Sequence, residues 1–197
     1  MRFFACLLTA SLSLVAYPIH AQDAARPRTP PTTRTLPRPS TTDDLFDRLA
    51  KARSEDEAKG IASLIERRWA RSGSDTADLL YSRAAEAFEE KDYPLSVELL
   101  DRILTLQPGW AEAWYRRAIV FYQLDDPVGA MADLHQALTL EPRHFGAWTG
   151  LGHIYLASDD KPHALEAYRR ALKLNPQEST IQVIVSHLDH EVDGLDL

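Results

Sequence analysis

The sequence has 197 residues, of which 45% are hydrophobic and 26% are charged, a composition typical of a globular protein with room for a core. Residues 42–197 contain 17 Lys or Arg and 28 Asp or Glu, a net charge of −11. So acidic a segment is unsuited to nucleic acid, because that affinity depends on neutralising phosphates, and an anionic lipid surface would repel it. These numbers exclude a nucleic-acid-binding protein and favour another class of partner.

Residues 1–21 have the pattern of a secretory signal peptide: a basic start at Arg2, an apolar run over residues 3–16, and a cleavage motif that ends at Ala21. The run is shorter than the about 20 apolar residues of a membrane-spanning helix, which is the alternative. We therefore expect an exported bacterial protein, periplasmic or secreted, with no stable membrane insertion after cleavage. Because Cys6 is the only cysteine, cleavage would leave no thiol or disulfide chemistry.

Residues 22–41 are rich in Pro, Thr and Arg and have almost nothing apolar to bury. Such a composition predicts a disordered linker with a bias toward extended polyproline II. The stretch from Pro27 to Pro30 matches the PxxP pattern, so a docking peptide or a tether to an anionic surface is the alternative function.

Residues 42–76 are predicted to form a helical hairpin. Thr42 is the expected cap of its first helix, and Ser54 with Glu57 has the spacing of a capping box that opens the second. Apolar residues then recur at a 3–4 spacing up to Trp69, as on one face of an amphipathic helix. The hairpin has the topology of a degenerate copy of the repeats that follow.

The next part of the sequence repeats with a period of 34 residues, in units at 77–110, 111–144 and 145–178. Trp114 and Trp148 are one period apart, as are several alanines and leucines. A fixed period of this length indicates stacked helical hairpins. One proline is expected to open the second helix of each unit and another to end it: Pro94, Pro127 and Pro162 at the start, and Pro108, Pro142 and Pro176 at the end.

The units resemble tetratricopeptide repeats, most fully at 145–178, which carries Trp148, Leu151, Gly152, Tyr155, Ala164, Tyr168, Ala171 and Pro176. The resemblance implies an all-α fold, a solenoid of antiparallel helical hairpins wound into a superhelix. Residues 179–197 are expected to form a C-terminal capping helix and tail. Small residues such as Gly152 and Ala164 would let the two helices of a hairpin approach closely, and the large side chains of Trp148, Tyr155 and Tyr168 are expected to fill the core between them.

Arg83 and Arg117 stand where the family pattern has leucine. A charge at a half-buried position needs a partner, and Asp133, on the second helix of the same unit, is the candidate for Arg117. We interpret this as a structural ion pair. The alternative is an arginine that is available to the carboxylate of a ligand.

No catalytic constellation is recognisable, since the sequence lacks a Gly-rich phosphate loop and the GxSxG, HExxH and CxxC motifs. His187 and His190 lie three residues apart and could provide half a metal site, but we interpret them as part of a solvated polar face of the terminal helix. We predict a protein that is not an enzyme and has neither a cofactor nor a metal site.

The resemblance also implies a ligand surface, namely the concave face formed by the first helices of the hairpins. Carried over position by position, it selects a partner-binding groove: Tyr81, Phe88, Tyr115, Arg116, Ile119, Tyr122, Thr149 and His153. Exposed Tyr and Phe are typical anchors for a peptide or partner helix, although these rings could instead pack against neighbouring hairpins. Arg116 is the only basic residue at the positions of the family's chaperone-tail clamp, so an acidic chaperone tail is not expected.

We therefore predict a non-catalytic interaction scaffold that binds a protein or peptide partner in this groove, in the cell envelope. The alternative is a self-assembling structural protein whose copies stack through the ends of the solenoid. A monomer is the favoured oligomeric state.

Overall fold

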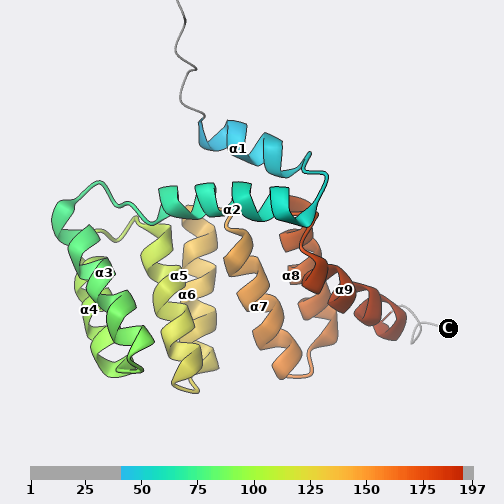
Figure 1. The fold of residues 1–197 in the computed structure, drawn as a ribbon. Helices are drawn as coiled ribbons and strands as arrows, with labels where there is room; N and C mark the ends of the chain where they lie inside the picture. Colours follow the sequence, from blue (N-terminus) through green and yellow to red (C-terminus); the bar gives the residue numbers. More distant parts are fainter. Residues whose placement is uncertain (1–40, 193–197) are drawn as a thin grey trace, which may run out of the picture. The chain divides into compact units, whose positions relative to one another are not determined.

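The computed structural model describes residues 41–192, in which every regular element is an α-helix (Figure 1). The all-α prediction is confirmed. The expected signal peptide and most of the expected linker, at 1–40, lie outside the described residues, as does the tail at 193–197. Within the described part, no helix is both long enough and apolar enough to cross a membrane.

The helices in residues 41–192 pack mainly in chain order. Their bounds are α1 Thr42–Leu49, α2 Glu55–Trp69, α3 Asp75–Glu89, α4 Tyr93–Leu106, α5 Ala111–Gln123, α6 Pro127–Leu140, α7 Phe145–Ala157, α8 Lys161–Leu174 and α9 Ser179–Val192. The most extensive contacts join α3 to α4, α5 to α6 and α7 to α8, the hairpins of the 34-residue units, and each hairpin packs on the helix that follows it. The predicted solenoid of helical hairpins is thus confirmed.

The turn inside each hairpin is built in the same way three times. Lys91, Asp125 and Asp159, one period apart, have φ angles of 61°, 60° and 59°, in the left-handed region that residues other than glycine rarely adopt. The aspartate that follows each of them caps the second helix by accepting the backbone N–H three residues further on. A proline lies in the first turn of each second helix, as predicted.

A hydrogen bond between consecutive hairpins also follows the period. Trp114, Trp148 and Gln182 are one period apart, and each donates a side-chain N–H to the carbonyl oxygen of the proline six residues before it, at 2.9, 3.0 and 2.5 Å. Helix α9 therefore continues the register as the first helix of an incomplete fourth unit. Its position after the last complete hairpin agrees with the predicted capping helix.

The core prediction holds fully for Tyr168, which is buried, and in part for Trp148, which is half-buried and packs against a buried hydrophobic cluster, as does Trp114. An arginine covers one face of each ring: the guanidinium carbon of Arg117 lies 4.8 Å from the Trp114 centroid, and that of Arg170 lies 4.6 Å from the Trp148 centroid. The burial is partial because each indole N–H reaches a carbonyl just after the preceding helix, which holds that edge of the ring near the surface.

Gly152 allows α7 and α8 to approach each other closely. A Cβ atom at this position would lie 2.5 Å from Cε1 of Tyr168, whose side chain is fully buried. In the preceding hairpin the corresponding small residues, Ala118 and Ala130, are also buried. The predicted role of small residues in hairpin packing is confirmed.

Arg117 forms the predicted ion pair. Its Nε and Nη2 donate to the two carboxylate oxygens of Asp133 at 2.7 and 2.8 Å, and its Nη1 donates to Asp101 of the preceding hairpin at 2.6 Å. Because the guanidinium is held from α4 and α6 together, its role is structural, and a ligand carboxylate would have to displace these partners. Arg83, the corresponding residue of the first unit, is exposed.

The first hairpin differs from the prediction in its caps. Thr41 rather than Thr42 caps α1, in a reciprocal pair of hydrogen bonds with Asp44. Ser54 caps α2 by accepting the N–H of Glu57, as predicted, but the Glu57 carboxylate accepts the N–H of the residue before Ser54. The spacing identified the cap serine, whereas the flexible glutamate reaches a neighbouring amide instead.

Helix α2 runs across the ends of α5 and α7 rather than along α3 (Figure 1). At its end, the carbonyl oxygen of Trp69 accepts the indole N–H of Trp110 at 2.6 Å, and the Trp69 ring packs on His144 and Phe145. Trp110 and His144 are the N-cap residues of α5 and α7. This arrangement brings Glu66, near the end of α2, to the same side as the first helices of the repeats.

Candidate partner-binding groove

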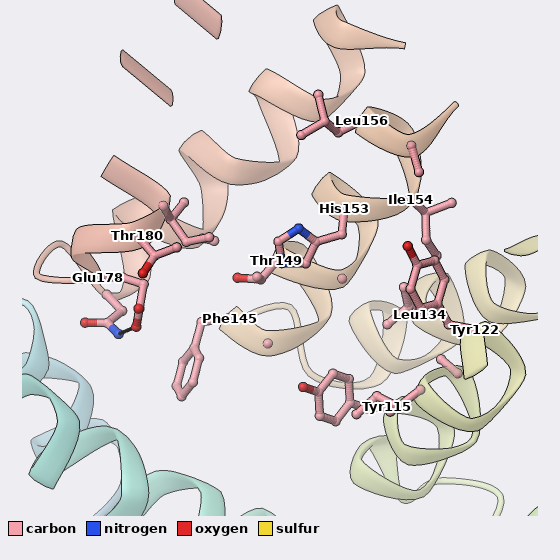
Figure 2. Close-up of a pocket in the computed structure, with 18 of the residues that line it drawn as sticks. Tyr115, Tyr122, Leu134, Phe145, Thr149, His153, Ile154, Leu156, Glu178 and Thr180 are labelled. Carbon is pink, nitrogen blue, oxygen red and sulfur yellow. Dashed lines mark hydrogen bonds between the residues drawn. The ribbon is translucent and has the colours of Figure 1, made fainter. Parts of the chain in front are cut away.

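A cavity of about 760 Å³ lies between α2, α5, α7 and α9, and we call it the groove (Figure 2). It is lined by Glu66, Tyr115, Ala118, Ile119, Tyr122, Leu134, Phe145, Gly146, Thr149, Gly150, His153, Ile154, Leu156, Ala157, Ala171, Asn175, Glu178, Thr180 and Ile181. Helices α5 and α7 supply most of these residues. The cavity has the size expected of a site for a ligand or a peptide segment.

Five of the eight residues selected from the sequence line the groove. They are Tyr115, Ile119, Tyr122, Thr149 and His153. In Figure 2 Tyr115, Thr149 and His153 project from two neighbouring helices into the same space. The family positions therefore mark one continuous surface in this chain.

The other three selected residues lie beside a smaller cavity of about 80 Å³ between α3 and α5. Tyr81, Phe88 and Arg116 line it, and Ile119 is common to both cavities. The phenol of Tyr81 and the guanidinium of Arg116 are already bonded to Glu112. These two residues therefore serve the packing of α3 on α5, and the larger groove is the better candidate for a partner.

The groove is mostly apolar. Tyr122, which is 44% exposed, and Phe145 and Leu156 offer large side chains to an occupant. Gly146 leaves room for the Tyr115 side chain at the base of the groove, since a Cβ atom there would lie 2.8 Å from the hydroxyl oxygen of Tyr115. A deep apolar floor with exposed rings is typical of surfaces that hold an apolar segment of a partner.

The charged side chains of the groove are both acceptors. Glu66 and Glu178 contribute carboxylates, and no Lys or Arg of residues 41–192 lines the cavity. Asn175 is 6% exposed, and its Oδ1 is buried with no hydrogen-bond donor, while its Nδ2 donates to Glu178 at 3.3 Å. An unpaired buried acceptor is costly, so a donor brought by an occupant would be stabilising here.

His153 lies at the wall of the groove and is tied to the core beneath it. Its Nδ1 is 2.7 Å from the hydroxyl oxygen of Tyr168, and the two rings meet edge to face. Partial burial lowers the pKa of His153 below its ordinary value, and burial raises the pKa of Tyr168 to about 12. The imidazole is therefore neutral near pH 7 and adds no positive charge to the groove.

A buried cluster around Glu112 closes the end of the groove beside α2. The Glu112 carboxylate, 3% exposed, accepts hydrogen bonds from the Tyr81 hydroxyl at 2.7 Å and from Arg116 Nε at 2.8 Å, and lies 3.2 Å from His144 Nε2. Burial alone would raise the pKa of Glu112, but the bond to His144 and the charge of Arg116 outweigh it and lower that pKa. Glu112 is thus held as a carboxylate with its oxygens satisfied.

The orientation of His144 is fixed from both ring nitrogens. Nδ1 accepts the N–H of Ala147 as the cap of α7, at 3.1 Å, so Nε2 is the nitrogen that donates to Glu112. The ring stacks on Trp69 with centroids 4.3 Å apart and lies 4.4 Å from the ring of Tyr115. Burial and the nearby Glu112 carboxylate raise the pKa of Tyr115 to about 12, so its hydroxyl keeps its proton.

Sequence reasoning missed several groove residues. Glu66, Phe145 and Asn175 lie outside the positions that the family pattern selects. Asn175 and Glu178 could have been found from the sequence, because they lie in the turn that precedes α9, the last helix that follows the 34-residue period. Nothing local indicated that α2 would contribute Glu66.

Within residues 41–192, no group of three or more His, Cys, Asp or Glu side chains could hold a metal ion. His187, half of the site considered from the sequence, instead lies 3.1 Å from the carboxylate of Glu191, one turn along α9. The geometry supports the interpretation of His187 as part of a solvated helix face.

Comparison with known proteins identifies the repeats. One tetratricopeptide repeat model matches residues 84–147 and a second matches residues 146–178. The chain belongs to the tetratricopeptide repeat family. A TPR repeat-containing protein of Rhizobium etli is 38% identical over 91 residues, which cover 46% of this chain and 45% of that relative. The match thus spans less than half of the length of the relative.

Solved tetratricopeptide repeat domains share the fold. The first TPR of Spaghetti (RPAP3) bound to the HSP90 peptide SRMEEVD has a TM-score of 0.57 at 18% identity, covering 61% of this chain and 95% of that one. The Sgt2 TPR domain from Aspergillus fumigatus has a TM-score of 0.57 at 20% identity, and the match covers 62% of this chain and 83% of that one. The TPR2B domain of yeast Sti1, in its pHsp70 complex, has a TM-score of 0.55 at 21% identity, and the match covers 60% of this chain and 99% of that one. These similarities show the fold of the repeats.

Proposed function

We propose that this tetratricopeptide repeat protein is a non-catalytic scaffold that binds a segment of another protein, an extended peptide or a helix, in the groove. The observation that carries the proposal is the cavity of about 760 Å³ with Tyr115, Tyr122 and Thr149 on its floor and rim. Exposed aromatic side chains around an apolar floor supply the anchor pockets that peptide recognition uses.

The solved neighbours support a peptide as the occupant. The RPAP3 domain is bound to an HSP90 peptide, and the Sti1 domain is in a pHsp70 complex. Both are peptide or chaperone complexes of the same fold. The groove of this chain differs in charge, because no Lys or Arg in its described residues lines the cavity, so the acidic HSP90 peptide is not the expected ligand here.

The end of the stack at α9 disfavours self-assembly. Three residues of α7 face α8: Trp148, Gly152 and Tyr155. One period later α9 has polar residues at these positions: Gln182, Ser186 and Asp189. A polar last face is the usual device by which a solenoid avoids further stacking. We therefore propose a monomer, and light scattering that shows a concentration-dependent rise in mass would favour the self-assembling alternative instead.

We also propose that the protein works outside the cytoplasm, in the bacterial periplasm. The support is the sequence pattern of residues 1–21, with its basic start, apolar run and cleavage motif. Mass spectrometry of the protein from fractionated cells tests this. A chain in the periplasmic fraction that begins after Ala21 is expected, and an uncleaved chain confined to the cytoplasm would contradict the proposal.

Site-specific photocrosslinking in cells tests the scaffold function. A photoreactive amino acid at Tyr122 or at Thr149 should capture the same partner protein. The same amino acid at Ala132, exposed on α6 and outside the groove, is the matched control. Equal capture from Ala132, or capture of unrelated proteins from Tyr122 and Thr149, would show that the groove is not the binding surface.

A further inference from the structure

Resting on the proposed function, we propose that the groove selects a cationic partner segment, in which a Lys or Arg side chain flanked by apolar residues donates to acceptors on the groove wall. The apolar floor would take the flanking side chains. The acceptors are the carboxylates of Glu66 and Glu178 and the buried Oδ1 of Asn175.

The balance of charge around the cavity is the first support. Glu66 comes from α2 and Glu178 from the turn before α9, so carboxylates stand on two separate elements of the groove. Neither is joined by an ion pair to a Lys or Arg of residues 41–192, and none of those cations lines the cavity. Arg116, the nearest basic residue among the selected positions, is bonded to Glu112 at 2.8 Å and lines the smaller cavity.

Unmet hydrogen bonding is the second support. Asn175 Oδ1 is the buried side-chain atom without a partner in the described chain, and it belongs to a residue that lines the groove. It can only accept. A guanidinium has five N–H donors and an ammonium has three, so either could satisfy this oxygen together with a carboxylate.

The electrostatic environment of Glu66 is the third support. Partial burial and the nearby carboxylate of Glu112 raise the pKa of Glu66 above its ordinary value. Arg116, His144 and Arg67 offset these effects only in part. A positive group from a partner would favour the carboxylate form of Glu66, whereas an acidic group would raise its pKa further. The net charge of −11 over residues 42–197 also attracts a cationic segment over longer distances.

Four synthetic peptide pools test the inference by fluorescence anisotropy against the protein. Each pool is ten residues long, has blocked termini, and is random in Ala, Leu, Phe and Ser except for a fixed central residue. That residue is Arg, its neutral isostere citrulline, Leu or Glu. We expect the Arg pool to bind about tenfold more tightly than the citrulline pool, and the Glu pool to bind most weakly.

Matched variants locate the effect. Glu66→Gln and Glu178→Gln should each weaken the Arg pool about two- to fivefold and leave the Leu pool unchanged. Glu98→Gln removes one exposed carboxylate from α4, outside the groove, and should change neither. Equal binding of the Arg and citrulline pools, or an equal effect of Glu98→Gln, would overturn the inference.

The failure of the proposed function looks different. Thr149→Trp fills the groove, and circular dichroism checks that this variant folds; Tyr122→Ala serves as a second groove variant. If the Leu pool binds and both variants weaken it while Arg gives no advantage, the groove binds peptides and only the cationic preference is wrong. If no pool binds, or if neither variant affects binding, the groove proposal is wrong and the inference is wrong with it.

Discussion

The indole of Trp69 stacks on the imidazole of His144, with ring centroids 4.3 Å apart and an angle of 12° between the planes. The stack places the last residue of α2 against the cap of α7, and His144 in turn reaches Glu112 of α5. Packing and hydrogen bonding thus join the first hairpin to two repeats. The groove gains its α2 wall from this contact.

Replacement of Trp69 should weaken the packing of α2 on the repeats. Trp69→Ala removes the stack on His144 and the packing on Phe46 and Phe145, and we expect a loss of about 3 kcal/mol in the free energy of unfolding. Urea unfolding measures it. Trp148→Ala is the control: this ring is half-buried like Trp69 but has no aromatic ring packed on it in the described residues, so its loss should cost less, about 1–2 kcal/mol. Equal losses would contradict the role given to Trp69.

Glu112 should make stability dependent on pH in the acid range. Its pKa is lowered on folding, so its stabilisation is present above the ordinary value of 4.5 and is lost as the pH falls from there through the folded pKa. We expect Glu112→Gln to lower the free energy of unfolding at pH 7 by about 2–3 kcal/mol, because Arg116 loses a buried charged partner. On acidification, the free energy of unfolding of this variant should fall less than that of the wild type. Unfolding curves at pH 7, 5, 4 and 3 measure this.

The control for Glu112 is Glu98→Gln, which breaks an exposed pair with Arg102 and should change stability by at most about 1 kcal/mol. His153 contributes a separate acid effect: its pKa is lowered by burial, so the protein should lose stability as the pH falls below 6.5. The effect of His153 therefore starts at a higher pH than that of Glu112. An acid profile of Glu112→Gln identical to that of the wild type would contradict the assignment.

Two glycine substitutions should have opposite signs. Gly152→Ala places a Cβ atom 2.5 Å from the ring of buried Tyr168, and we expect a loss of about 1–3 kcal/mol as α7 and α8 are pushed apart. Gly60→Ala, inside α2 with no atom within 4 Å of the new Cβ, should gain about 0.5–1 kcal/mol. Thermal unfolding of both variants is the measurement, and a stable Gly152→Ala would show that the approach of the helices is not limiting.

The periodic turns allow a test with neighbouring residues. Lys91 has a φ of 61°, so Lys91→Gly should relieve strain and raise stability by up to about 1 kcal/mol. Asp92 caps α4 through the N–H of Leu95, so Asp92→Ala should lower stability by about 1 kcal/mol. A thermal midpoint that falls for both variants would indicate that the Lys91 side chain, rather than the backbone angle, matters at this turn.

Much of the repeat architecture could be predicted because it is local. The prolines, the small residues at Gly152 and Ala130, and the pairing of Arg117 with Asp133 all act within one hairpin, where sequence spacing fixes which side chains meet. The partial exposure of Trp148 was not predicted, because its size indicated a fully buried residue. Its indole N–H donates to the carbonyl oxygen of Pro142, at the surface between two hairpins.

The α2 side of the groove could not be predicted, because it depends on contacts that do not follow the period. Trp69 contacts His144 because the first hairpin lies across the repeats, and the other units have Trp110 and Glu178, not histidine, at the position of His144. The family pattern likewise selected Tyr81 and Arg116 as groove residues. Their bonds to Glu112, which arise where two neighbouring hairpins meet, assign them to packing.

The central claim is that the groove between α5 and α7 holds the partner. Isothermal titration calorimetry of the photocaptured partner with the wild type, Tyr122→Ala and Val128→Ala tests it most directly. Val128 is 75% exposed on α6 and does not line the groove, so Val128→Ala should leave the affinity unchanged, whereas Tyr122→Ala should weaken it about tenfold or more. Equal affinities for the wild type and Tyr122→Ala, or a loss confined to Val128→Ala, would contradict the account.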